Sequence, residues 1–475
     1  MSSPNKLYSL RKNQDYISEL PDTILCLILS LLSTKSVVKT SILSKRWNYL
    51  WIKVPALDIT EVHQRYEWLN LEQKICFKSF VDKVLLHNDV SYLQRFCLDV
   101  FDVDDIYVTS WLTNASGREM HELCINIRRT SQLRTCLPPR LLSSERLVVL
   151  KLKGHLIIGT IMNLNLHLPN AETIELDGLK FVDDGFLKRL LSSCSLLKEL
   201  HIVDCYGMPK LLDVESLTLE SLTIKQECFN YYMVIKEFPT YFVINTPNVR
   251  YLCLHGTLSH YIIGDMCALT EADLDVVYCD EDYDNHDEDD NEDEDKDLKN
   301  RISALKKLPV DCQAQELIRK VSGVKTLRIG YRISLQRVGY QNFIKNKKLP
   351  VFPNLTCLGM EAGELMRDLL KCAPNLKSLE ISTVDYDCGF APELAPKHLP
   401  SLENIVVERF NGESEDIVVI EYFLEAASAL KNMYVRLNCS VSLKSDDNDV
   451  LKEILSLPRS SPVCEVNISS IYDSE

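Results

Sequence analysis

The chain lacks the short motifs through which many enzymes bind phosphate, activate a nucleophile or hold zinc. Its 475 residues contain no G-x-G-x-x-G, no G-x-x-x-x-G-K followed by Ser or Thr, no G-x-S-x-G and no H-E-x-x-H sequence. No C-x-x-C pair occurs among its 17 cysteines, which disfavours zinc ribbons and thioredoxin-like sites. The 10 histidines are scattered along the chain, and none lies in a ligand-like cluster. These absences predict a protein with no catalytic site, no cofactor and no bound metal.

Long hydrophobic runs are also missing. The longest apolar stretch, from Ile24 to Leu32, is too short to span a bilayer. The polar N-terminal residues lack the apolar core of a secretory signal. The number of cysteines is odd, and positions such as Cys97 would also suit a small apolar residue. We therefore expect an intracellular protein, cytoplasmic and/or nuclear, with no membrane partner and with reduced thiols packed in its core.

An excess of basic charge is absent as well. Lys and Arg number 53 against 68 Asp and Glu, a formal net charge of −15 that argues against general binding to nucleic acid. Residues 280–297 alone hold 13 acidic side chains and one lysine, so the rest of the chain is nearly neutral, at −3. Like charges repel and this run has little to bury, which predicts a disordered loop. The loop is either a solubilising insertion or an electrostatic guide for a basic target.

The first sixty residues differ from the rest, because they carry a net charge of +4 and a dense helical pattern. Pro21 suits the first turn of a helix, and the residues that follow, up to Leu32, are apolar nearly all round. A helix of this kind is either fully buried or keeps a second face for a partner. Thr34 can cap a second helix, and Trp47 and Trp51 lie in a third, basic segment.

Residues 13–56 resemble an F-box. The resemblance rests on Leu20-Pro21-Asp22, the aliphatic helix, the pair Val37-Val38 and the run from Leu43 to Trp47, in that order. It implies docking to a Skp-family adaptor, and through the adaptor to a cullin. Carried over by position, the adaptor-binding residues would be Leu20, Pro21, Ile24, Ile28, Val37, Val38 and Trp47. Ile42, Leu43 and Tyr49 would then belong to the internal core.

The remainder of the chain repeats the template L-x-x-L-x-L. The mean step between copies is about 25 residues before the acidic run and about 26 after it, within the range of leucine-rich repeats. Thirteen copies begin at Leu93, Met120, Leu147, Ala171, Leu197, Leu219, Val249, Leu269, Val324, Leu355, Leu376, Leu402 and Leu430. Apolar pairs that would end a helix precede four of them, at Leu190-Leu191, Leu317-Ile318, Leu369-Leu370 and Phe423-Leu424.

This pattern predicts an irregular solenoid of parallel strands on one face and helices or turns on the other. The second template leucine of each copy would be buried, as at Leu200, Leu222, Leu327 and Leu379. Side chains between the template positions would form a solvated outer face, since successive strand residues point to opposite sides. Examples are Lys151, Glu175, His201, Thr223, Cys253, Arg328 and Glu380.

Residues 390–469 resemble the plant FBD domain, which follows F-box and leucine-rich repeats in one large plant family. The resemblance rests on Leu399-Pro400-Ser401-Leu402, an acidic link at 413–416, a helix through Tyr422 and Phe423, and the run from Leu457 to Cys464. The same stretch continues the strand–helix alternation. It predicts a last amphipathic helix around Ile454 and a closing strand at 464–468, which would cap the solenoid.

The predicted fold class is α/β, with a three-helix F-box at 13–56, a leucine-rich-repeat solenoid at 57–389 and an FBD cap at 390–469. The resemblance implies a substrate-recognition subunit of an SCF-type cullin–RING E3 ubiquitin ligase, whose repeats bind a target protein and which catalyses nothing itself. One alternative is a non-degradative interaction scaffold. An enzyme with a hidden active site is a third possibility.

Overall fold

The computed structural model describes most of the chain. The described residues are 16–17, 19–61, 71–129, 134–159, 166–183, 185–226, 241–257, 261–277, 316–330, 349–382, 390–438 and 447–470. The acidic run at 280–297 lies outside them. The described chain forms two compact units, Met1–Asp183 with Ser193–Ser195, and Asp184–Ser192 with Leu196–Glu475.

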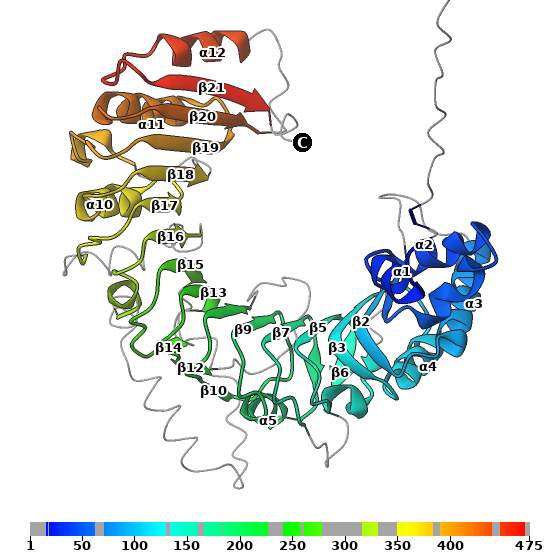
Figure 1. The fold of residues 1–475 in the computed structure, drawn as a ribbon. Helices are drawn as coiled ribbons and strands as arrows, with labels where there is room; N and C mark the ends of the chain where they lie inside the picture. The colour runs from blue at the N-terminus through cyan, green and yellow to red at the C-terminus, as the bar shows by residue number, and fades with distance from the viewer. Residues whose placement is uncertain are drawn as a thin grey trace, which may run out of the picture. The chain divides into compact units, whose positions relative to one another are not determined.

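The first unit begins with short helices and continues as strands separated by helices or turns (Figure 1). In chain order its elements are α1 (Asp22–Leu29), α2 (Thr34–Lys39), η1 (Thr40–Ile42), η2 (Trp47–Lys53), β1 (Ala56–Thr60), α3 (Leu71–His87), β2 (Tyr92–Phe101), α4 (Asp105–Ala115), β3 (Glu119–Arg128), β4 (Thr135–Cys136), η3 (Pro139–Leu142), β5 (Val149–Gly154), β6 (Leu156–Ile158), β7 (Thr173–Asp177) and β8 (Lys180–Phe181), where η marks a 3₁₀-helix.

The second unit alternates strands first with shorter strands and then with helices. Its elements are α5 (Phe186–Ser192), β9 (Glu199–Val203), β10 (Leu211–Glu215), β11 (Ser221–Lys225), β12 (Tyr241–Asn245), β13 (Tyr251–Thr257), β14 (Tyr261–Ile263), β15 (Glu271–Val277), β16 (Thr326–Ile329), β17 (Cys357–Met360), α10 (Glu364–Cys372), β18 (Ser378–Ser382), η6 (Pro392–Leu394), β19 (Asn404–Phe410), α11 (Ser414–Ala426), β20 (Asn432–Leu437), α12 (Asp447–Ser456) and β21 (Glu465–Ser470).

The main strands of each unit pair in parallel with the strand of the next repeat. The order is β1-β2-β3-β5-β7 in the first unit and β9-β11-β13-β15-β16-β17-β18-β19-β20-β21 in the second. Each of the thirteen predicted template copies ends in one of these strands, which confirms the prediction of a repeated strand unit. The sequence did not predict β1, nor the small parallel sheets β4-β6-β8 and β10-β12-β14.

Burial alternates along the strands as the template requires. Leu200, Leu222, Leu327 and Leu379 are all 0% exposed, so the predicted inward register is correct. The expectation of a solvated outer face is wrong at two positions, because Thr223 and Cys253 point outward and yet are buried. The placement of Cys97 in the core is also wrong, because its neighbours Phe96 and Leu98 point inward and the thiol lies on the outer face, partly exposed.

Asparagine side chains tie adjacent repeats together just before a strand. Each asparagine follows a proline in the turn before the strand. Its side-chain amide donates to a backbone carbonyl of the preceding repeat. The bonds are Asn170 Nδ2 to Glu145 O (2.6 Å), Asn248 Nδ2 to Leu217 O (2.7 Å), Asn354 Nδ2 to Gly323 O (3.2 Å) and Asn375 Nδ2 to Pro353 O (2.8 Å). These bonds connect each turn to the turn of the preceding repeat.

Helices cover the core behind the later strands, as the apolar pairs predict. Leu190-Leu191 lies in α5, Leu369-Leu370 in α10 and Phe423-Leu424 in α11. The helix α11 begins with a capping box between Glu413 and Asp416. The predicted last helix and closing strand are α12 and β21, and Ile454 is fully buried. Figure 1 shows α11 and α12 alongside the last strands.

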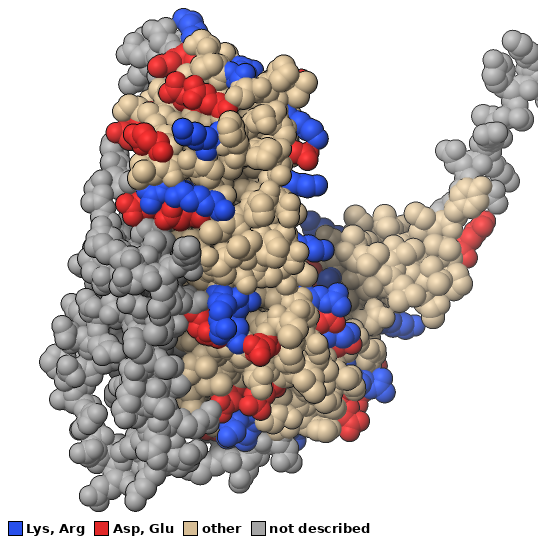
Figure 2. Space-filling view, turned by 90° about the vertical axis from the view of Figure 1, so that its left-hand side faces the viewer, with Lys and Arg blue, Asp and Glu red and all other residues tan. Residues whose placement is uncertain are grey.

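Charged side chains of both signs are dispersed over the described part of the face in Figure 2. On the face shown in Figure 2, basic and acidic residues lie next to one another among the described residues, without a large patch of one sign. Several are paired between adjacent repeats, as Lys431 Nζ, just before β20, is with Glu403 Oε2, just before β19, at 2.5 Å. In the part of the chain that is described, no helix has both the length and the apolar character needed to cross a bilayer.

Candidate functional site

The N-terminal helical subdomain, residues 19–56, has a small core of its own. From α1 it takes Leu25, Cys26 and Leu29, and from the following segments Val37, Trp47, Leu50, Val54 and Ala56; Leu20 and Trp51 pack against this cluster. Burial raises the pKa of the Cys26 thiol, whose Sγ lies 3.8 Å from the Leu50 carbonyl oxygen. The thiol is therefore a neutral core group.

Two predicted adaptor contacts belong to this core. Val37 is 2% exposed and Trp47 is 9% exposed. Trp47 lies in the 3₁₀-helix η2, where side chains three residues apart share one side. Trp47 and Leu50 therefore both point inward. Val37 and Trp47 therefore pack inside the subdomain, and its exposed apolar surface is formed by other side chains.

The outer side of α1 carries a second apolar stripe. Ile24, Leu27 and Ile28 are each 41–47% exposed, and Leu31 and Leu32 in the turn after the helix are 80% and 42% exposed. Residues spaced by three and four lie on one side of a helix, and this set lies opposite the buried Leu25, Cys26 and Leu29. We call the five exposed side chains the α1 stripe.

A second exposed group follows α2. Ile42, Leu43 and Tyr49 are 89%, 63% and 65% exposed, so the prediction that they form internal core is wrong. The physical reason is the change from α- to 3₁₀-geometry at Thr40. The α-helical spacing therefore no longer decides which side chain faces inward.

The remaining predicted contact residues lie at the margins. Pro21 is exposed and precedes the first turn of α1, while Leu20 and Val38 are partly buried. Arg46 fixes the start of α1, because its guanidinium bonds Asp22 Oδ1 at 2.7 Å and also the Leu20 carbonyl. Neither Asp22 nor Arg46 is buried, so this ion pair contributes little to the free energy of unfolding.

The helical subdomain is joined to the first repeat by specific hydrogen bonds. The prediction that Thr34 caps the second helix is wrong, because Ser33 occupies the N-cap and Thr34 is the first residue of α2. The buried Thr34 hydroxyl instead accepts the backbone N–H of Asp58 in β1 at 2.7 Å. Asn88, at the end of α3, donates to the carbonyl oxygens of Ile52 and Val54 at 3.1 and 3.2 Å. These bonds connect the subdomain that carries the α1 stripe to β1 and to the end of α3.

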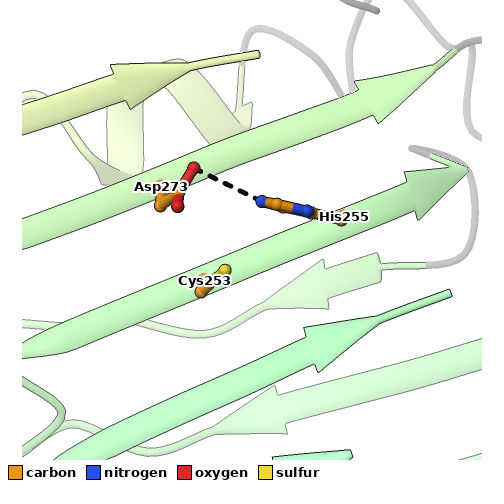
Figure 3. Close-up of side chains that lie close together, drawn as sticks. All are labelled: Cys253, His255 and Asp273. Carbon is orange, nitrogen blue, oxygen red and sulfur yellow. Dashed lines mark hydrogen bonds and ion pairs between the residues drawn. The ribbon is translucent and has the colours of Figure 1, made fainter. Parts of the chain in front are cut away.

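A different kind of cluster lies in the second unit, on the outer face of β13 and β15 (Figure 3). Cys253, His255 and Asp273 place their ligand atoms within 4.8 Å of one another, and His255 Nε2 lies 3.3 Å from Asp273 Oδ1. Burial would lower the pKa of His255, but hydrogen bonds to Asp273 and Cys253 raise it to about 9. Burial would raise the pKa of Asp273, but His255 lowers it. The expectation that no histidine lies in such a cluster is wrong.

Comparisons with known proteins agree with the first of these sites. The F-box domain matches residues 17–56, and the family described as "FBD-associated F-box protein At5g56370, LRR repeats" matches residues 108–264. The putative F-box protein At1g58310 of Arabidopsis thaliana is 30% identical over 394 residues, which cover 78% of this chain and 73% of that protein. The chain belongs to the plant F-box/FBD/leucine-rich-repeat family.

Further relatives in this family match along nearly the whole chain. F-box/LRR-repeat protein 13 of Arabidopsis thaliana is 29% identical, over 95% of this chain and 96% of the relative. The F-box/FBD/LRR-repeat protein At1g78750 of the same organism is 28% identical, over 96% of each chain. The F-box match coincides with the helical subdomain, so the α1 stripe is the exposed apolar face of the F-box.

Proposed function

We propose that this F-box protein is the substrate receptor of an SCF-type cullin–RING ubiquitin ligase. The observation that carries the proposal is the α1 stripe, an apolar helix face left exposed on a domain matched as an F-box. A soluble domain of this size rarely leaves so many neighbouring aliphatic side chains exposed unless a partner covers them. The proposed partner is a Skp-family adaptor, which links the chain to a cullin.

The docking mode follows from the helix. An amphipathic helix that lays its apolar face in a groove is read at positions i, i+3, i+4 and i+7, which here are Ile24, Leu27, Ile28 and Leu31. Fully burying one such side chain contributes about 1.5–3 kcal/mol before the cost of association. In this proposal Pro21, Ile42 and Leu43 extend the contact, while Val37 and Trp47 position it from within.

The target would bind the outer face of the second unit's parallel sheet. This face carries side chains of the kind that dominate protein interfaces, with Arg328 on β16 and Tyr434 on β20 both exposed. The repeats supply a rigid surface whose composition can vary without disturbing the buried leucines. Target residues brought beside a ubiquitin-loaded enzyme would then react by proximity, with no catalytic group supplied by this chain.

The adaptor contact is tested by titrating the full chain with a purified Skp-family adaptor. Ile28→Glu places a charge in the α1 stripe and should weaken binding by about 2 kcal/mol or more, roughly 30-fold. Ile106→Glu is the matched control, because Ile106 is an equally apolar side chain on α4, 81% exposed and outside the F-box. Equal affinity for the two variants, or no binding by the unaltered chain, would contradict the proposal.

The ligase role is tested separately by proximity labelling with the proteasome blocked. The full chain is compared with a chain lacking residues 1–56. A target should be labelled by both chains, and its half-life should lengthen when only the shortened chain is present. A target labelled by both chains but turned over at the same rate would favour the non-degradative scaffold instead.

A further inference from the structure

The outer face of the second unit brings together three metal-binding side chains that are distant in sequence. Cys253 and His255 alternate along β13 and so share one face, and Cys253 is the register partner of Asp273 on β15. Their ligand atoms lie within 4.8 Å of one another, and Figure 3 shows the imidazole directed at the carboxylate. We propose that Cys253, His255 and Asp273 bind a borderline divalent transition metal of the zinc type.

The donor set selects the class of ion. A thiolate, an imidazole and a carboxylate together suit zinc and its neighbours, whereas Mg²⁺ and Ca²⁺ require oxygen ligands alone. The spacing also agrees, because two ligands about 2.0–2.1 Å from a tetrahedral ion lie roughly 3.3–3.4 Å apart. The 3.3 Å between His255 Nε2 and Asp273 Oδ1 matches one edge of such a tetrahedron.

The burial of the three groups places the ion at the surface of the sheet. Cys253 is fully buried and forms the floor, whereas the His255 and Asp273 side chains are 24% and 25% exposed and form the rim. Three protein ligands leave the fourth position of a tetrahedral ion directed at solvent, where a water or a donor from a partner can bind. A site with this open position differs from a closed structural zinc site.

The ligands are held by their surroundings before any ion binds. On the core side of β13, Leu252 and Leu254 are both 0% exposed and fix the strand. The Tyr261 hydroxyl donates to the His255 carbonyl oxygen at 2.8 Å. Tyr251 lies two residues before Cys253 on the same face of β13, and burial with the nearby Cys253 and Asp273 raises the pKa of Tyr251 to about 12.

Two cationic side chains next to the cluster oppose a bound cation, and a further carboxylate on the same face offsets part of their charge. Lys225 is the register partner of His255, and Arg328 is the register partner of Asp273. Arg328 Cγ and Glu380 Oε2 both lie near Gly359 on β17, since a Cβ at Gly359 would lie 3.3 Å from the first and 3.8 Å from the second. Asp275, the register partner of His255 on β15, adds a further carboxylate to the same face.

The simpler reading is a His255–Asp273 ion pair beside an unrelated thiol. The two interpretations differ in whether the Cys253 thiolate binds the ion, so the test detects a bond between the metal and sulfur. Co²⁺ is the spectroscopic probe, because a tetrahedral cobalt–thiolate centre shows a near-ultraviolet charge-transfer band and visible d–d bands. Zn²⁺ affinity is then measured by competition with a chromophoric chelator. Both measurements use the full chain, with thiols kept reduced.

We expect the unaltered chain to take up Co²⁺ with a thiolate band that Zn²⁺ displaces. Cys253→Ser should abolish this band. Cys253→Ser and Asp273→Asn should each weaken Zn²⁺ binding more than about tenfold, since removing an outer-shell partner alone costs about 10–100-fold. Cys357→Ser is the matched control, because Cys357 is a partly exposed thiol on the same face of β17, away from the cluster.

Three results would overturn the site. The first is a cobalt–thiolate band as intense in Cys253→Ser as in the unaltered chain. The second is an equal loss of Zn²⁺ affinity in Cys253→Ser and Cys357→Ser. The third is uptake of Co²⁺ and Zn²⁺ by the unaltered chain that does not exceed the uptake by Cys253→Ser. Circular dichroism of the metal-free variants distinguishes a lost ligand from a lost fold, and Asp273→Asn conserves the shape of the side chain. The outcome does not depend on adaptor binding, because the F-box is unchanged in every variant.

Discussion

The F-box and the repeats use the same aliphatic side chains in opposite ways. In the repeats, the template leucines are at most 7% exposed because the neighbouring strands and the covering helices or strands enclose them. In the F-box, α1 buries Leu25 and Leu29 but leaves the α1 stripe exposed. A repeat is completed by the next repeat of the same chain, whereas the F-box has too little chain to complete itself. This difference between the two regions supports the proposal that a partner covers the α1 stripe.

The largest expected effect on stability comes from Trp47, because it is the largest side chain in the F-box core. We expect Trp47→Ala to cost about 3–5 kcal/mol of F-box stability, as a large aromatic removed from a core does. Tyr49→Ala, at a side chain 65% exposed two residues away, should change stability by under about 0.5 kcal/mol. Denaturation followed by tryptophan fluorescence checks both, since all four tryptophans lie in the first 111 residues. Similar losses for the two variants would show that the exposed and buried classes are misassigned.

The next effect is in the repeats. Leu379→Ala should cost about 2–5 kcal/mol, because it leaves a cavity in a core that neighbouring strands share. Glu380→Ala, at the next residue on the outer face, should cost under about 0.5 kcal/mol. Chemical denaturation monitored by far-ultraviolet circular dichroism measures the difference. If both substitutions were equally damaging, the inward register of β18 would be incorrect.

A smaller effect concerns ion pairs on the outer face of the first unit. Burial would raise the pKa of Glu175, but Lys153 and Lys151 lower it overall, and Lys151 Nζ lies 3.4 Å from the carboxylate. A carboxyl whose pKa is lower in the folded state stabilises the fold above its unfolded pKa of about 4.3, and this contribution is lost as the pH falls through the folded value.

We therefore expect Glu175→Gln to lower the free energy of unfolding at pH 7 by less than about 1 kcal/mol, because both lysines are partly exposed. The difference from the unaltered chain should disappear at acidic pH. Urea denaturation at a series of pH values from 7 down to the acidic range provides the measurement. A difference that is independent of pH would mean that the glutamine acts through packing and not through charge.

The sequence predicted the repeats well and the F-box surface only in part. A template that recurs about every 25 residues determines both the strand positions and which side chains are buried, since strand side chains alternate with period two. The stripe on α1 also follows from helical spacing at Ile24 and Ile28. The exposure of Ile42 and Tyr49 does not, because the chain changes there to 3₁₀-geometry, whose onset no sequence pattern marks.

The Cys253, His255 and Asp273 cluster illustrates a further limit. The sequence shows Cys253 and His255 as outward residues of one strand, but Asp273 is eighteen residues beyond His255 and belongs to the next repeat. Only the register between β13 and β15 makes Cys253 and Asp273 neighbours. Aligning the repeats by their template leucines would have revealed this pairing, because a parallel sheet stacks equivalent positions. Motif searches within one segment do not detect it.

The central claim is that the α1 stripe is covered by an adaptor, and hydrogen–deuterium exchange of the full chain with and without a Skp-family adaptor tests it most directly. The account predicts slower exchange on binding in peptides that contain α1 and the turn after it, residues 21–33, with peptides of α3 and α4 unchanged. Binding that leaves residues 21–33 unprotected while it protects another part of the chain would contradict the claim.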